Sequence, residues 1–230
     1  MRTRVRRSGR REVAIGLGTY AAYLLARRFV DTDRGRAAAR RNAARMVALE
    51  RRLGIHVEPA FQRPLLERRR LCHVLNAGYV TLNVVLTVGL PVVLWRRRDP
   101  GFPWLRRSAA LAILGASPVF LLFPCDPPRR LDGFADTVKE ISGFDLDSGL
   151  VAQLYNPIAA FPSIHMAFAV VTAAGVRASY GAAAPRAFAL AYPPAVACTV
   201  FATGNHYVLD ALAGSALGLA AVRLSRALER

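Results

Sequence analysis

The sequence predicts an all-α integral membrane protein, a bundle of about six transmembrane helices with an amphipathic interfacial helix near the N-terminus. Two observations lead to this fold class. Hydrophobic residues make up 53% of the chain, yet its formal net charge is +17. Residues 1–70 hold most of that charge, with 19 Arg against 6 acidic residues, and the later arginines flank long uncharged runs. This arrangement is typical of basic segments beside a membrane.

The sequence predicts neither a nucleic-acid partner nor a cysteine-based metal or redox site. A nucleic-acid partner is not expected, because the arginines flank apolar runs and are not interleaved with base-stacking aromatic residues. The three cysteines, Cys72, Cys125 and Cys198, are isolated and lack the spacing of a metal or redox site. The chain divides into a basic N-terminal region over residues 1–70 and a membrane-embedded domain over residues 71–226.

The N-terminal region is expected to contain two helices. Its basic leader is followed by the apolar segment Val13–Ala26. Arg27 and Arg28 come next, where a secretory signal would need small residues for cleavage, so we interpret the segment as a retained membrane helix. Residues 34–54, rich in Ala, Arg and Leu, predict an amphipathic helix at an anionic lipid surface or, equally, a helix packed on the rest of the protein.

The remaining spans follow from uncharged runs and from prolines. Leu71–Trp95 and Ser108–Pro124 predict two spans, and the acidic stretch 125–147 predicts an external loop with one short helix. Ser148–Val176 is uncharged for 29 residues, and its prolines predict a loop before a helix that starts at an N-cap, Ser163. The fifth and sixth spans are Gly181–Ala202, with a kink or a late start at its prolines, and His206–Val222.

The flanking arginines predict an orientation. The connection 96–107 carries five Arg, which places it, the N-terminus and the C-terminus in the cytoplasm. Residues 125–147 and 203–205 then face outward, so we expect a plasma-membrane protein whose candidate site faces outward. The basic connection 27–70 contradicts this orientation unless it is a long surface-bound segment, because the rule applies best to short loops.

Two histidines, each at the start of an apolar segment, are the candidate catalytic residues. On a helix, the spacing of His206 and Asp210 places both side chains on one face, one turn apart. Asp210 can accept a hydrogen bond from one ring nitrogen and raise the basicity of the other, which makes His206 a candidate nucleophile toward phosphorus. His165 would then protonate the departing oxygen. An ionisable residue in an apolar span is a functional candidate by default.

A phosphate group is the expected ligand of this site. Ser163 would supply a hydroxyl beside the free N–H groups of a helix start. Gly204 and Asn205 permit a tight turn and a close approach of ligand to backbone. Arg129 or Arg130 could bind the phosphate through two parallel hydrogen bonds.

Other interpretations of the same residues stay open. His206 and Asp210 could form a structural hydrogen bond or a proton relay in a transporter. A two-histidine metal site with Asp210 is also conceivable, but no third strong ligand has convincing spacing. Ser163 could be an N-cap only, and Arg129 with Arg130 could mark the lipid head-group boundary.

Three motifs resemble a known family. FPSIHMA (residues 161–167) and GNHYVLDALAG (residues 204–214) resemble the second and third signature motifs of the type 2 phosphatidic acid phosphatase superfamily. FPCDPPRRLDGFADT (residues 123–137) resembles the Pro-Pro-Arg segment that replaces the first motif in the inositol phosphorylceramide synthase-like branch. The resemblance covers roughly residues 70–222 and implies a six-helix bundle with metal-independent, phosphohistidine chemistry.

The resemblance also implies a role for each site residue. His206 is the nucleophile, Asp210 orients it, His165 is the general acid, and Ser163 and Arg129 bind phosphate; no metal or other cofactor is expected. Thr199 and Val200 stand where the hydrolase form carries Ser-Arg, and no lysine precedes Arg129 in the first-motif region. Both departures favour the synthase-like branch.

The expected function is therefore that of a membrane lipid phosphoesterase. Its substrate would be a lipid phosphate or a phospholipid in the surrounding membrane. Water as acceptor makes it a lipid phosphatase, whereas an alcohol such as inositol makes it a head-group phosphotransferase. The rival is a non-catalytic membrane transporter or scaffold that keeps the fold: the missing arginine supports it, and the intact set of His165, His206 and Asp210 argues against it.

Overall fold

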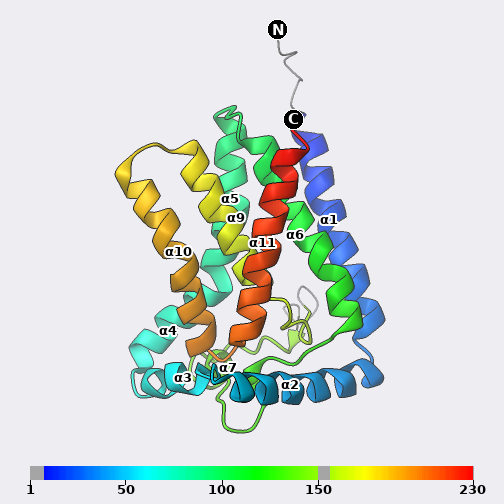
Figure 1. Cartoon of the computed structure of the whole chain (residues 1–230), viewed down its shortest axis with the longest axis vertical. Coiled ribbons are helices and arrows are strands. Elements are labelled where there is room, and N and C mark those ends of the chain that lie inside the picture. The colour runs from blue at the N-terminus through cyan, green and yellow to red at the C-terminus, as the bar shows by residue number, and fades with distance from the viewer. Residues whose placement is uncertain (1–7, 150–155, 230) are drawn as a thin grey trace.

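The computed structural model describes residues 8–149 and 156–229, and the elements it shows there are helices, which confirms the all-α fold class. The long helices stand side by side in a bundle, and α2 crosses one end of it (Figure 1). The helices of the bundle are α1 (Gly9–Val30), α4 (Arg69–Ala77) continuing through the π-helix η1 (Gly78–Leu82) into α5 (Asn83–Arg96), α6 (Phe102–Leu122), α9 (Ile164–Ser179), α10 (Ala183–Ala202) and α11 (Val208–Ala227). The leader before residue 8 and the first part of the Ser148–Val176 prediction lie outside the described residues.

Within residues 8–149 and 156–229, three helices are long and apolar enough to cross a membrane: the continuous run Arg69–Arg96, α6 and α11. Helices of this kind indicate an integral membrane protein. The apolar helix α9 is shorter, with 16 residues. The expectation of about six spans is thus supported for three. The α1 helix is not among them; it has Glu12 in its first turn and arginines in its last, and these charged residues lower its mean hydropathy.

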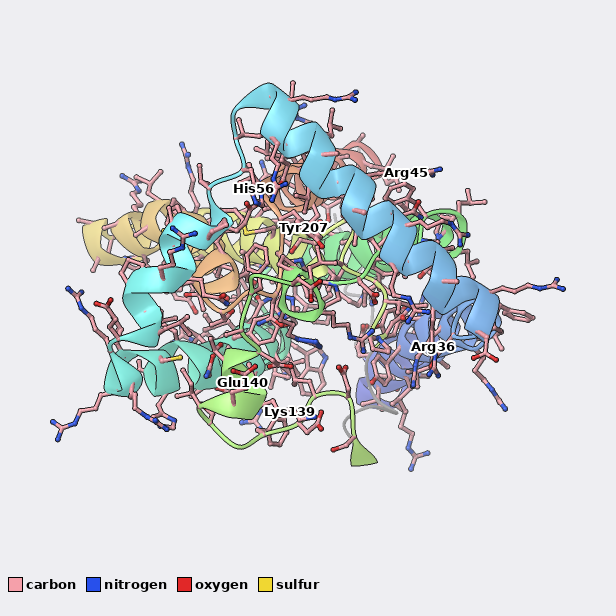
Figure 2. The ribbon with its side chains drawn as sticks, turned by 90° about the horizontal axis from the view of Figure 1, so that it is seen from below. Arg36, Arg45, His56, Lys139, Glu140 and Tyr207 are labelled. Carbon is pink, nitrogen blue, oxygen red and sulfur yellow. The ribbon has the colours of Figure 1, made fainter. Side chains whose placement is uncertain are left out.

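The α2 helix (Asp33–Leu53) begins at Thr32, whose side chain accepts a hydrogen bond from the Gly35 N–H, and ends at Gly54 in the left-handed conformation. Its apolar face packs on the protein: Ala43 and Met46 contact the cluster that contains Tyr207. Arginines occupy the other faces, among them Arg36 and Arg45 (Figure 2). Packing on the rest of the protein is therefore observed for one face, and contact of the other faces with lipid stays a prediction.

The segment 125–147 is a loop that contains one short α-helix, as expected. It holds the 3-10 turn η2 (Pro128–Arg130) and the helix α7 (Thr137–Glu140). The expected N-cap of α9 is confirmed as well, because the Met166 N–H donates to Ser163 Oγ at 3.3 Å. The last span differs from its expected bounds: α11 begins at Val208, after a turn, and continues past Arg223 and Arg226.

The contact between α9 and α11 positions the candidate site. Gly214 and Gly218 of α11, four residues apart, face the start of α9, and a Cβ on Gly218 would lie 2.6 Å from the Ala167 carbonyl oxygen. Small residues at this spacing let two helices approach closely. The two helices are also joined by a hydrogen bond from the Ser163 N–H to the Asp210 carbonyl oxygen at 3.0 Å. The N-terminal ends of α9 and α11 consequently lie together, toward the end of the bundle that α2 crosses (Figure 1).

Candidate active site

The two motif histidines meet where α9 and α11 begin. His165 lies in the first turn of α9, and His206 lies in the turn between α10 and α11. His206 Nε2 is 3.2 Å from His165 Nδ1, and the ring centroids are 5.3 Å apart. Residues 41 positions apart in the chain are thus brought within hydrogen-bonding distance.

Asp210 contacts His206, but not by the geometry that the spacing predicts. His206 precedes α11, so the two side chains do not share a helical face. Instead Asp210, in the first turn, reaches back: its Oδ2 lies 3.2 Å from His206 Nδ1 and accepts the Tyr207 N–H at 3.0 Å. If Nδ1–H donates to the carboxylate, Nε2 is left with a lone pair and accepts the Nδ1–H of His165.

The turn before α11 is held by backbone hydrogen bonds. The Val200 carbonyl oxygen accepts from the N–H groups of Asn205 at 2.9 Å and His206 at 3.2 Å. Gly204 has φ +70°, a conformation that side chains rarely adopt, and its carbonyl oxygen accepts from the Arg129 N–H at 2.7 Å. The turn therefore links His206 to the loop that carries Arg129.

Arg129 is buried and already engaged. Its Nε donates to Asn205 Oδ1 at 3.1 Å, and its terminal nitrogens lie 3.3 Å from Asp147 and 3.8 Å from Asp136. With 6% of its surface exposed, it does not sit as a free cation at a head-group boundary. Arg130 shares Asp147 with Arg129, at 2.9 Å, and also lies 2.9 Å from Asp126.

A pocket opens beside these residues. Its wall includes His165, His206, Arg129 and Asn205, together with the aromatic rings of Tyr79 and Phe120. The remaining expected site residues do not line this pocket. Asp210 supports His206, Gly204 shapes the turn, Arg130 pairs with carboxylates outside the pocket, and Ser163 is fully buried as the N-cap of α9.

The environment of His206 favours its uncharged form. Burial lowers the pKa of His206, and the positive charge of Arg129 acts in the same direction. A neutral imidazole keeps the Nε2 lone pair that a nucleophile needs. The pocket thus combines a neutral nitrogen base with a guanidinium and an amide close by.

Sequence reasoning missed the residues that hold His165. Tyr79 stacks on its ring with centroids 4.6 Å apart, and Asn83 donates to its carbonyl oxygen at 3.2 Å. Asn83 also accepts from the Tyr192 hydroxyl at 3.1 Å, so it joins three helices. The only signal for Asn83 was an amide within an uncharged run. No pattern distinguished Tyr79 from the other aromatic residues.

Comparison with known proteins identifies the family from the sequence. A model of the PAP2 superfamily matches residues 44–224, which include every residue of the candidate site. No curated protein matches the chain, and no solved structure matches it. The match begins at residue 44, well before the motifs, so the family pattern covers the second half of the crossing helix α2 and the bundle from α4 onward.

Proposed function

The chain belongs to the PAP2 superfamily, whose members are generally enzymes, and from this premise we propose that it is a membrane lipid phosphoesterase that acts through a phosphohistidine on His206. Membership suggests a phosphatase-type phosphoesterase. One observation carries the finer proposal: His206 has a carboxylate on Nδ1 and a second histidine 3.2 Å from Nε2. The proposed nucleophile thus has the group that orients it on one side and the proposed proton donor on the other.

The first step uses these three groups. Nε2 of His206 attacks phosphorus, an N–P bond forms, and the bond between phosphorus and the leaving oxygen breaks. The leaving oxygen takes a proton from His165, which acts as the imidazolium and is left as the neutral imidazole; its Nδ1 lies 3.2 Å from His206 Nε2. Asp210 accepts the Nδ1–H of His206 and stabilises the positive charge that develops on the ring.

Arg129 and Asn205 are the proposed phosphate ligands, because both line the pocket beside His206. Arg129 would exchange part of its contact with Asp147 and Asp136 for the phosphate oxygens. Ser163 Oγ accepts the Met166 N–H, and Ser163 is fully buried and does not line the pocket. Its main role is therefore to begin α9, so that His165 is held in place.

In the second step an acceptor oxygen attacks phosphorus, the N–P bond breaks, and His165 takes the acceptor proton. Water would make the protein a lipid phosphatase, and an alcohol such as inositol would make it a head-group phosphotransferase. Thr199 and Val200 occupy the positions of the missing Ser-Arg, which supports the synthase-like branch. A plasma-membrane location with the pocket facing outward stays a prediction.

Phosphate release from a panel of lipid phosphates, by purified protein with EDTA and with or without inositol, tests this function. Release without an acceptor identifies a phosphatase, and a new phospholipid formed only with the alcohol identifies a transferase. Radiolabelled substrate should trap an acid-labile, base-stable phosphoprotein, and His206→Ala should abolish both the label and turnover. A chain that traps no label from any donor lipid would be the non-catalytic scaffold or transporter instead.

A further inference from the structure

A second cluster of ionisable residues lies outside the pocket, where the connection between α2 and α3 (Glu58–Leu66) meets the start of α11. Glu50 is in the last turns of α2, His56 lies in the connection, and Glu58 is the first residue of α3. Both glutamate side chains are 0% exposed, and that of His56 is 13% exposed. Figure 2 labels His56 on this side of the molecule.

One oxygen of each carboxylate is used by α11. Glu58 Oε1 accepts the Val208 N–H, and Glu50 Oε1 accepts the Leu209 N–H, both at 2.7 Å. These are N–H groups of the first turn of a helix, which have no partner within the helix itself. The two hydrogen bonds fix the orientation of both carboxylates and turn their second oxygens toward each other.

Three buried atoms of the cluster have no hydrogen-bond partner among the described residues: Glu50 Oε2, Glu58 Oε2 and His56 Nδ1. His56 Nδ1 lies 3.0 Å from Glu58 Oε2 and 3.6 Å from Glu50 Oε2, and ligand atoms of the three residues lie within 4.8 Å of one another. Two buried carboxylates facing each other are costly unless a cation joins them.

We propose that Glu50, His56 and Glu58 bind a divalent transition-metal ion, Zn²⁺ or Mn²⁺, which ties α2 and α3 to the first turn of α11. Two ligands about 2.1 Å from an ion in tetrahedral geometry lie about 3.4 Å apart. This is close to the 3.0 Å and 3.6 Å that separate His56 Nδ1 from the two carboxylate oxygens. One imidazole and two carboxylates suit these ions better than Mg²⁺, which prefers oxygen ligands alone. The hydrogen bonds to Val208 and Leu209 are the outer contacts that orient such ligands.

The site is structural and lies apart from the proposed phosphoryl transfer. None of its three ligands lines the pocket. Its effect on the reaction is indirect, because Val208 and Leu209 immediately precede Asp210, which holds His206. Fixing the first turn of α11 fixes the position of that carboxylate.

Metal content and thermal stability of the full chain test the proposal without any activity measurement. The protein is purified in detergent, its affinity tag is removed, and bound metals are measured by inductively coupled plasma mass spectrometry. We expect about one Zn²⁺ or Mn²⁺ per chain, a lower Tm after prolonged EDTA treatment, and recovery by several degrees on adding ZnCl₂ or MnCl₂. Protein without stoichiometric metal, and with a Tm that neither ion changes, would overturn the site and leave a proton shared by the carboxylates.

Two variants separate loss of the ion from loss of the fold. Glu58→Gln keeps an amide oxygen for the Val208 N–H, and His56→Ala leaves both α11 hydrogen bonds in place; each should lose the bound ion and the Tm response to metal. Glu67→Gln removes the same charge from an exposed position and is the matched control. Stoichiometric metal retained by both His56→Ala and Glu58→Gln would show that the ion binds elsewhere.

Discussion

Adding one methyl group at Gly214 should separate the two motifs that carry the candidate site residues His165 and His206. The Cβ of Gly214→Ala would overlap the Ser163 carbonyl oxygen and lie 2.9 Å from its carbonyl carbon and 3.1 Å from its Cα. All three are backbone atoms and cannot rotate away, so α11 must move from α9. Overpacking of this kind costs about 1–3 kcal/mol of folding stability. A shift approaching 1 Å between His165 and His206 should lower kcat by roughly 10²-fold.

The assay for Gly214→Ala pairs the thermal unfolding of the detergent-solubilised protein with phosphate release from a lipid phosphate. We expect a lower Tm, a lower kcat and a nearly unchanged KM, because Arg129 and Asn205 do not lie on α11. Gly89→Ala is the matched control: it also adds a methyl group to a helix of the bundle, but its Cβ meets nothing within 4 Å. Wild-type Tm and kcat in Gly214→Ala would refute the close contact between the two helices.

Three further changes probe the pocket. Asp210→Asn keeps the shape but removes the charge that stabilises the His206 ring, so kcat should fall by about 10²–10⁴-fold, as measured by single-turnover phosphoprotein formation; a loss below threefold would contradict the role of the carboxylate. Arg129→Lys loses the planar fork and should lower kcat/KM by about 10²–10³-fold, whereas Arg130→Lys, outside the pocket wall, should change it little. Equal losses in both arginine variants would argue against Arg129 as the phosphate ligand. Because burial lowers the pKa of His206 from 6.5, its neutral form persists below that pH, and the acid limb of the kcat/KM profile due to this residue should lie below pH 6.5. An acid limb above pH 6.5 that shifts in Asp210→Asn, the variant that changes the partner of His206, would belong to His206. It would show that the His206 ring of the free protein is charged near pH 6.5, against this prediction.

Local signals in the sequence determined much of the fold and the identity of the site. Uncharged runs marked the helices, and a serine after a proline marked the start of α9 at Ser163. Glycine and proline marked the loop of residues 125–147. The Pro-Ser-x-His and His-Tyr-x-x-Asp motifs identified His165, His206 and Asp210, since each motif lies within a few neighbouring residues. The family match over residues 44–224 agrees with that resemblance at the level of the superfamily.

The relative placement of those motifs was decided only by the tertiary structure. The distance of 3.2 Å between His206 and His165 depends on how closely α11 packs on α9, which Gly214 and Gly218 allow. Likewise, Arg129 reaches Asn205 because the loop of residues 125–147 folds back under α10 and α11, across 76 positions of sequence. Spacing along a chain does not encode such contacts.

The Glu50, His56 and Glu58 cluster shows the same limit most clearly. Each residue looked like part of a charged, amphipathic N-terminal region, where a glutamate is normally solvated. The structure buries both carboxylates against the first turn of α11, about 150 positions away in the chain. Local sequence determines which side chains are available, but only packing between distant helices decides which of them lose their water and must find a new partner.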